Sequence, residues 1–180
     1  MARPRTVDRD QVLDVAEAVM SAEGTAGLTF GGIAKVAGIS KATVQSIFKT
    51  REAMIEAMLQ RWIAKEQLRF EAVAGQNPDR SQRVSAHIKT TEEETAYAHR
   101  RVANLFAALT GAGDDNQLML SWYAVRLGDL AATTDADRRE RIALLATEGA
   151  FFLRYIAGIE MTDERWTEIF DDLQKLADAD

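Results

Sequence analysis

A glycine followed two residues later by a serine separates two short amphipathic segments near the N-terminus. Thr29 stands at the start of the first segment and Gly38 at its end, which predicts a short helix with a hydroxyl N-cap and a left-handed glycine C-cap. Ser40 can cap a second short helix that ends near Phe48. Two brief helices joined by a three-residue turn predict a helix-turn-helix over this part of the chain.

Apolar residues recur at helical spacing along almost all of the remaining chain, and no segment of any length alternates as a strand would. The sequence therefore predicts an all-α fold, with an N-terminal three-helix domain at residues 1–51 joined by a long helix to a second helical domain at residues 52–180. Before the middle of the chain we expect a helix over 9–23 and a long helix from Glu52 to about Gly75. Residues 81–111 form either one bent helix or two helices, and we favour two that break near Thr90–Thr91. A loop at Gly111–Asn116, a central helix over 118–130 that is apolar on every side, a helix from Asp135 to Ile159 and a last helix after Thr162 follow.

The residue content excludes several classes of site. The chain contains no cysteine, so it can form no disulfide and no thiolate metal site. His87 and His99 are twelve residues apart and lack the spacing of a zinc motif, so we expect no metal, no cofactor, no catalytic residue and no enzyme activity. No apolar run reaches the roughly 18 residues that a membrane span needs, and the polar N-terminus is unlike a signal peptide, so we expect a cytoplasmic protein without membrane contact.

Charge is unevenly distributed along a chain whose net charge is −6. Residues 1–65 hold nine basic and seven acidic residues, whereas the remaining 115 residues hold 13 basic and 21 acidic ones. Only the N-terminal third can therefore favour phosphate. Arg3 and Arg5 flank a proline, and this arm either enters a narrow minor groove of DNA or is a disordered terminus.

The segment from Gln11 to Leu59 contains the run Thr29-Phe-Gly-Gly-Ile-Ala-Lys-Val-Ala-Gly-Ile-Ser-Lys-Ala-Thr-Val-Gln-Ser-Ile-Phe-Lys-Thr-Arg-Glu-Ala-Met-Ile55. It resembles the DNA-binding domain of the TetR family of bacterial regulators. The resemblance implies a homodimer, a ligand-responsive C-terminal domain and, usually, repression. It also implies that seven residues lie near DNA, namely Thr29, Ser40, Lys41, Thr43, Gln45, Ser46 and Lys49.

Two features depart from the family pattern. The family often has an aromatic residue and a histidine where this chain has Gln45 and Ile47, and Gly31–Gly32 replaces polar helix formers. Each glycine lowers the intrinsic stability of the first short helix by about 1 kcal/mol. Gln45 is the best candidate for direct readout, because its amide can donate to N7 and accept from N6 of adenine at the same time.

The other polar residues divide by their chemistry. Lys49 and Arg51, beyond the second short helix, are expected on phosphates. The hydroxyls of Thr29 and Ser40, together with the backbone donors at the two helix N-termini, assist them. Thr43 can touch a thymine methyl group.

Two groups of residues in the C-terminal part are candidates for ligand binding and dimerisation. An apolar ligand cavity can be lined by residues that could equally be ordinary core, namely Met58, Trp62, Phe106, Met119, Trp122, Tyr123 and Phe151. Five polar side chains either orient a ligand or are simply hydrogen-bonded within the protein or to water, namely His87, Tyr97, His99, Arg126 and Glu148. The helix after Asp135 has two apolar stripes, of which one suits its own core and the other a symmetric partner. The interface candidates are Ile142, Leu145, Gly149, Phe152, Ile156, Trp166, Ile169, Phe170 and Leu173.

These features together predict a ligand-responsive transcriptional regulator, most simply a repressor. It would bind a palindromic or pseudopalindromic operator in double-stranded DNA as a homodimer and respond to a small-molecule effector of unknown identity. The alternative is a helical ligand-sensing or dimerising protein whose helix-turn-helix has lost or weakened DNA binding. Three features favour this alternative: the excess of acidic residues in most of the chain, the missing aromatic residue and the glycine pair.

Overall fold

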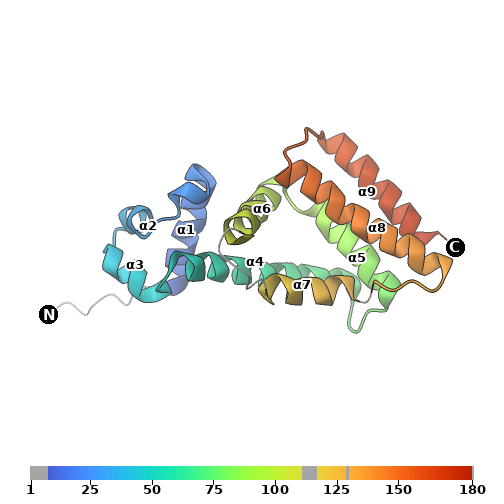
Figure 1. Cartoon of the computed structure of the whole chain (residues 1–180), viewed down its shortest axis with the longest axis horizontal. Coiled ribbons are helices and arrows are strands. Elements are labelled where there is room, and N and C mark those ends of the chain that lie inside the picture. The colour runs from blue at the N-terminus through green and yellow to red at the C-terminus, as the bar shows by residue number, and fades with distance from the viewer. Residues whose placement is uncertain (1–7, 111–116, 129, 180) are drawn as a thin grey trace. The chain divides into compact units, whose positions relative to one another are not determined.

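The computed structural model describes residues 8–110, 117–128 and 130–179, and all regular structure in that part of the chain is helical (Figure 1). The elements are α1 (Arg9–Glu23), the 3-10 turn η1 (Thr25–Gly27), α2 (Phe30–Ala37), α3 (Lys41–Phe48), α4 (Arg51–Ala74), α5 (Arg80–Glu93), α6 (Ala96–Thr110), α7 (Gln117–Leu127), α8 (Asp135–Phe151), the π-helical turn η2 (Phe152–Ile156) and α9 (Asp163–Asp178). The predicted all-α class is confirmed. The predicted Arg3–Arg5 arm and the Gly111–Asn116 loop lie outside the described residues.

The break between α5 and α6 lies at Glu94–Thr95, four residues after the predicted break at Thr90–Thr91. Thr90 stays inside α5 because its side chain is buried and its hydroxyl donates to the carbonyl of Ala86 at 2.8 Å. Thr95 instead starts the next helix, since its Oγ1 accepts from the backbone N–H of Ala98 at 3.2 Å. A threonine that bonds back to the preceding turn thus continues a helix, and one that bonds forward caps the next.

Helix α7 is not the central helix that its apolar residues predict. Leu120 and Val125 on this helix are 58% and 52% exposed, and its buried side chains are those of Met119 and Arg126. The prediction of a central position is therefore wrong. Apolar residues on every side of a helix do not ensure that the chain itself covers every side.

The described residues divide into two compact units. The first unit contains the chain up to Trp62 and the part of α6 that begins at Asn104, and the second unit contains 63–103 and the C-terminal part from α7 onward. Helix α4 therefore contributes to both units, whereas the predicted domain boundary at residues 51/52 falls directly after its first residue. In the first unit α1 packs on α2 and α2 on α3, and in the second α5, α8 and α9 pack on one another.

Neither unit contains a helix that is both long and apolar enough to cross a membrane, as far as the structure describes the chain. Within the same residues, histidine and carboxylate side chains nowhere gather in a group that could hold a metal ion.

Candidate functional site

The turn between α2 and α3 has the capped geometry that the sequence predicts. The N–H of Gly32 donates to Oγ1 of Thr29 at 3.0 Å, and the N–H of Thr43 donates to Oγ of Ser40 at 3.0 Å. Gly38 has φ 66° and ψ 31°, the left-handed conformation that ends α2. The two helices are thus set at their angle by side-chain caps and one glycine.

Packing decides which face of α3 points away from the first unit. Val44 and Phe48 of α3 are buried, as are Ile33 and Ala34 of α2 and Leu28 before it. Because residues four apart lie on the same face of a helix, Val44 and Phe48 define the inward face. The opposite face of α3 is left for the polar residues.

Six of the predicted DNA-contacting residues are exposed and a seventh, Thr43, is half-buried; the exposed ones are Thr29, Ser40, Lys41, Gln45, Ser46 and Lys49. Among the described residues, the side chains of Lys41, Gln45 and Lys49 have no hydrogen-bond or ion-pair partner. A free amide and two free ammonium groups thus extend from α3 and its C-terminal end.

The hydroxyl groups on α3 are used locally. The hydroxyls of Ser40 and Thr43 are 2.8 Å apart, and the hydroxyl of Ser46 donates to the carbonyl of Thr43 at 2.8 Å. These two bonds hold the hydroxyls against α3 itself, and Oγ of Ser40 also accepts from the backbone N–H of Thr43 in the first turn.

Arg51 is bound within the first unit, which corrects its predicted role. Its Nε donates to the carbonyl of Leu28 at 3.0 Å and its Nη2 to the carbonyl of Thr25 at 2.8 Å. The guanidinium therefore fastens the start of α4 to the segment before α2, and we remove Arg51 from the phosphate contacts. The sequence has no signal for this role, because both acceptors are backbone groups more than 20 residues away.

Lys49 occupies a backbone conformation that is rare for a residue with a side chain. Its φ is 63° and its ψ −58°, and the N–H of Thr50 donates to the carbonyl of Phe48 at 2.6 Å. This is a γ-turn of the uncommon, strained kind, which costs about 1–3 kcal/mol. The turn directs the chain from α3 into α4.

Arg9 lies beside the C-terminal end of α3 and was not predicted from the sequence as a site residue. Its guanidinium carbon is 5.5 Å from the centre of the Phe48 ring, and the residue is exposed at the first turn of α1. A cation at a helix N-terminus is unfavourable for the helix dipole, which is the signal that could have identified Arg9 as a residue with another role.

Arg61 of α4 is also engaged inside the first unit. Its Nη1 is 2.7 Å from a carboxylate oxygen of Asp14, and its Nε donates to Glu17 at 3.0 Å. Although partial burial alone would lower it, the pKa of Arg61 is raised by these two carboxylates. This ion pair joins α4 to α1 and is unavailable to phosphate.

The predicted ligand-pocket residues fall into three groups. In the first unit Met58 is buried, and the rings of Trp62 and Phe106 meet edge to face with centres 6.0 Å apart. In the second unit Met119, Trp122 and Tyr123 belong to α7. Phe151 lies in another aromatic group of the second unit, 5.4 Å from the ring of His99.

The polar residues predicted as candidates for orienting a ligand also lie in different places. Tyr97 is 58% exposed, and His99 is stacked at 4.6 Å on the ring of Tyr155, where burial lowers its pKa to about 4. His87, Arg126 and Glu148 instead come together in the second unit around Trp122, whose ring centre lies 6.2 Å from that of His87 and 4.9 Å from the guanidinium of Arg126. The exposure of Tyr97 fits the alternative prediction, in which its side chain is solvated and does not orient a ligand.

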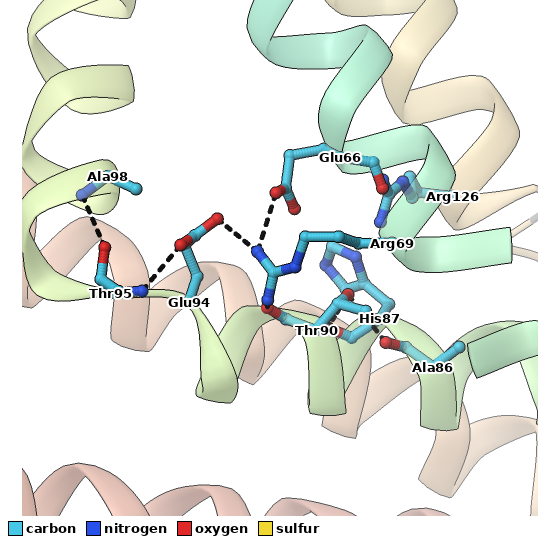
Figure 2. A network of polar contacts seen from close by, with 9 residues as sticks. All are labelled: Glu66, Arg69, Ala86, His87, Thr90, Glu94, Thr95, Ala98 and Arg126. Carbon is cyan, nitrogen blue, oxygen red and sulfur yellow. Dashed lines mark hydrogen bonds and ion pairs between the residues drawn. The ribbon is translucent and has the colours of Figure 1, made fainter. Parts of the chain in front are cut away.

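Two groups of bonded polar residues flank Arg126. In the Arg69 cluster, the Arg69 guanidinium binds the carboxylates of Glu66 and Glu94 and donates to the carbonyl of Thr90 at 3.3 Å (Figure 2). Burial, together with the nearby carboxylate of Glu94, raises the pKa of Glu66 to about 7.

In the second group, the Glu148 cluster, Nε2 of His87 and the hydroxyl of Tyr123 each lie 2.7 Å from the Glu148 carboxylate. Burial would raise the pKa of Glu148, but these hydrogen bonds and the charges of His87 and Arg126 hold it below its ordinary value. Burial and the Glu148 carboxylate raise the pKa of Tyr123. The carboxylate is therefore ionised at neutral pH, and the phenol is its hydrogen-bond donor.

The predicted dimer-interface residues divide into two sets. The outer face of α8 and η2 leaves apolar side chains half-exposed, namely Ile142, Leu145, Phe152 and Ile156. Gly149 and Ile169 are partly exposed. Trp166, Phe170 and Leu173 are buried in the second unit, because α9 turns its apolar face onto α5 and α8. For these three the prediction is wrong, since their apolar surface is already covered by their own chain.

Comparison with known protein families matches both parts of the chain. Residues 12–58 match the profile of bacterial regulatory proteins of the tetR family, and residues 81–178 match that of the tetracyclin repressor-like C-terminal domain. The HTH-type transcriptional regulator BetI of Rhizobium meliloti (strain 1021) is 32% identical over 146 residues, which cover 76% of this chain and 71% of BetI.

Solved structures share the fold at low sequence identity. A transcriptional regulator from Rhodococcus sp. Rha1 superposes with a TM-score of 0.71 at 19% identity, covering 95% of this chain and 96% of the other. The multidrug binding protein EbrR, solved with imidazole, superposes with a TM-score of 0.57 at 18% identity, covering 92% of this chain and 93% of EbrR.

Proposed function

Because this chain belongs to the TetR family of bacterial transcriptional regulators, it binds DNA, and we propose that it acts as a homodimeric, effector-responsive repressor. The family is one of regulators and not of enzymes, in line with the expectation of no catalytic residue. The observation that carries the proposal is the outer face of α3, where the polar groups of Lys41, Gln45 and Lys49 are free. Free amide and ammonium groups on a capped recognition helix suit base edges and phosphates.

Gln45 reads a base and Lys49 and Arg9 bind phosphate in this proposal. The exposed amide of Gln45 in the middle of α3 can form a bidentate pair with adenine. We expect Gln45→Ala to cost about 1–3 kcal/mol at one base pair of each half-site and little elsewhere. Binding titrations on single-base operator variants, selected first from random duplex DNA, measure this. A loss spread equally over all positions would end the readout role of Gln45.

Salt dependence tests DNA binding itself. If Lys41, Lys49 and Arg9 neutralise phosphates, log K falls linearly with log salt, with a slope of about −0.9 per phosphate contact. The matched control is Lys175→Ala on α9, a 76% exposed lysine side chain in the second unit, which should leave the slope unchanged. A flat salt dependence would favour a ligand-sensing protein that has lost its operator.

The outer face of α8 supports the proposed homodimer. Phe152 is 51% exposed and lies among other half-exposed apolar residues on the same face, a surface that two symmetric copies can cover. Phe152→Asp should give monomers in sedimentation and weaken operator binding to that of one half-site. Leu68→Asp, at an apolar residue of α4 that is 69% exposed, is the control and should stay dimeric. An intact Phe152→Asp dimer would remove this face from the interface.

The second unit supports effector control of DNA binding. The multidrug binding protein EbrR was solved in complex with imidazole, so this fold can hold a small molecule. Helix α4 runs unbroken from the first unit into the second. An effector that favours one of two arrangements of the second unit would change operator affinity through this helix.

A further inference from the structure

Arg126 is the bulkiest side chain that is buried almost completely in the described part of the chain, with 1% of the residue exposed. Burial lowers its pKa to about 10, so the guanidinium is still charged at neutral pH. A charge removed from water is strongly unfavourable unless a counter-ion and hydrogen bonds replace the lost hydration. The partners of Arg126 therefore decide why it is there.

The contacts of Arg126 replace only part of the hydration that its guanidinium loses on burial. Its Nη2 donates to the carbonyl of Glu66 at 2.9 Å, and its guanidinium lies over the rings of Phe70 and Trp122 at 4.2 and 4.9 Å from their centres. Its Nε is buried and meets no hydrogen-bond acceptor in the part of the chain that the structure describes. Among the described residues no carboxylate comes within 4 Å of the guanidinium.

The carboxylates of Glu66 and Glu148 stabilise the Arg126 charge at a distance, but their hydrogen bonds are made to other residues. Both glutamates of the Arg69 cluster bind Arg69, and the carboxylate of the Glu148 cluster accepts from His87 and Tyr123. A second buried atom, Nδ1 of His87, also lacks a partner, and its ring shares the neighbour Trp122 with Arg126. The unmet requirement in this part of the second unit is thus an acceptor for the Arg126 guanidinium.

We propose that the effector is a small organic acid whose carboxylate pairs with Arg126 between the Arg69 and Glu148 clusters. This inference rests on the proposed function, since it names the chemical class that the effector site takes. Arginine is suited to this role because its planar donors match a carboxylate. The apolar surroundings that Phe70, Trp122 and Tyr123 provide favour an apolar body on the acid.

A cationic effector fits the same residues less well. The ring faces of Phe70 and Trp122 that would attract a cation are already occupied by the Arg126 guanidinium. The charged guanidinium of Arg126 would also repel such a ligand. A carboxylic acid meets neither obstacle, because it supplies the acceptor that Arg126 lacks.

The experiment measures the thermal unfolding of the full chain with three sets of probes at millimolar concentration and equal ionic strength. The sets are carboxylates (benzoate, indole-3-acetate and octanoate), benzyl alcohol as the neutral control, and benzyltrimethylammonium as the cation. We expect at least one carboxylate to raise Tm by a few degrees, as a ligand at about ten times its Kd does. The alcohol and the ammonium ion should have no effect. Equal shifts with the cation, or none with any carboxylate, would overturn the proposal.

Arg126→Met separates a ligand-binding role from a structural one. The carbonyl of Glu66 lies inside α4 and already accepts a helical N–H, so the methionine leaves no orphaned acceptor. We expect the ligand-free variant to keep or raise its Tm and to lose the carboxylate shift. The exposed Arg138→Met is the control and should keep that shift. A clear fall in the Tm of ligand-free Arg126→Met would show that Arg126 is structural and would overturn the proposal.

A measurement of DNA binding shows whether a negative result concerns the organic-acid effector alone or the proposed regulator function as well. Ligand-free Arg126→Met should bind duplex DNA with the affinity and salt slope of the unmodified chain, because Arg126 belongs to the second unit. The active carboxylate should weaken DNA binding by the unmodified chain and not by Arg126→Met. DNA binding without any carboxylate response refutes the organic acid alone, whereas absence of DNA binding refutes the regulator.

Discussion

The outer face of α3 and the charged interior of the second unit contain similar side chains in opposite conditions. On α3, Lys41 and Lys49 are exposed and have no partner among the described residues, at little cost because water solvates them. In the second unit, Arg69 is held by two carboxylates, whereas Arg126 is buried without a carboxylate in direct contact among the described residues. A free charge is therefore weak evidence for a ligand at the surface and strong evidence in the interior.

The largest expected effect comes from breaking the interior network. Arg69→Met would leave the carboxylates of Glu66 and Glu94 close together without their shared cation. We expect the free energy of unfolding to fall by about 1–3 kcal/mol, less than for a fully buried pair because the Arg69 side chain is 34% exposed. Urea denaturation measures this, with Lys41→Met on α3 as the control that should stay within about 0.5 kcal/mol. Equal effects at both sites would remove the contrast between the two regions.

A pH-dependent difference should follow from Glu66. Its pKa in the folded protein is about 7, against an ordinary value of 4.5, so the folded state keeps a proton that the unfolded state releases. This contribution to stability is full below pH 4.5 and is lost as pH rises through 7. Glu66→Gln should therefore unfold a few degrees above the unmodified chain at pH 8 and at nearly the same temperature at pH 4.5.

His99 contributes with the opposite sign in part of the same range. Its pKa of about 4 in the folded protein, against 6.5, means that its contribution is lost as pH falls. The difference between Glu66→Gln and the unmodified chain cancels this term, because both contain His99. A difference in Tm that is the same at both pH values would contradict the assignment to Glu66.

The smallest expected effect is at Lys49, where two variants separate the contribution of the side-chain charge from that of backbone strain. Lys49→Gly and Lys49→Ala both remove the ammonium group, so each should weaken binding to all DNA sequences and reduce the salt slope by about 1. Only the glycine relieves the γ-turn, so Lys49→Gly should be more stable than Lys49→Ala by about 1 kcal/mol. Thermal unfolding and DNA titration of the two variants measure both effects. Equal stability would mean that the turn is not strained.

The sequence predicts the helix-turn-helix well because its determinants are local. Thr29, Gly38 and Ser40 act on backbone groups within a few residues, and the structure has each of them in the predicted role. Arg51 fails as a prediction because its acceptors are carbonyls that only the folded chain brings near.

The polar contacts inside the second unit could not be predicted from local sequence patterns for the same reason. Glu66 and Glu94 meet Arg69 from different helices, and His87 and Glu148 are 61 residues apart in the sequence. Helical periodicity assigns residues to faces, but it does not show which charges share an environment. His87, Arg126 and Glu148 could thus be named as polar candidates, whereas their shared surroundings required the fold.

The participation of α4 in the first unit determines how small an autonomous DNA-binding fragment can be. Met54, Ile55, Met58 and Leu59 of α4 are completely buried, and Arg61 holds α1 through Asp14 and Glu17. A peptide that stops at residue 51 would carry all the groups that we propose to contact DNA and would lack the helix that covers its core. It should behave as a largely unfolded chain, and proteolytic separation of the DNA-binding part should leave α4 attached to it at least as far as Trp62.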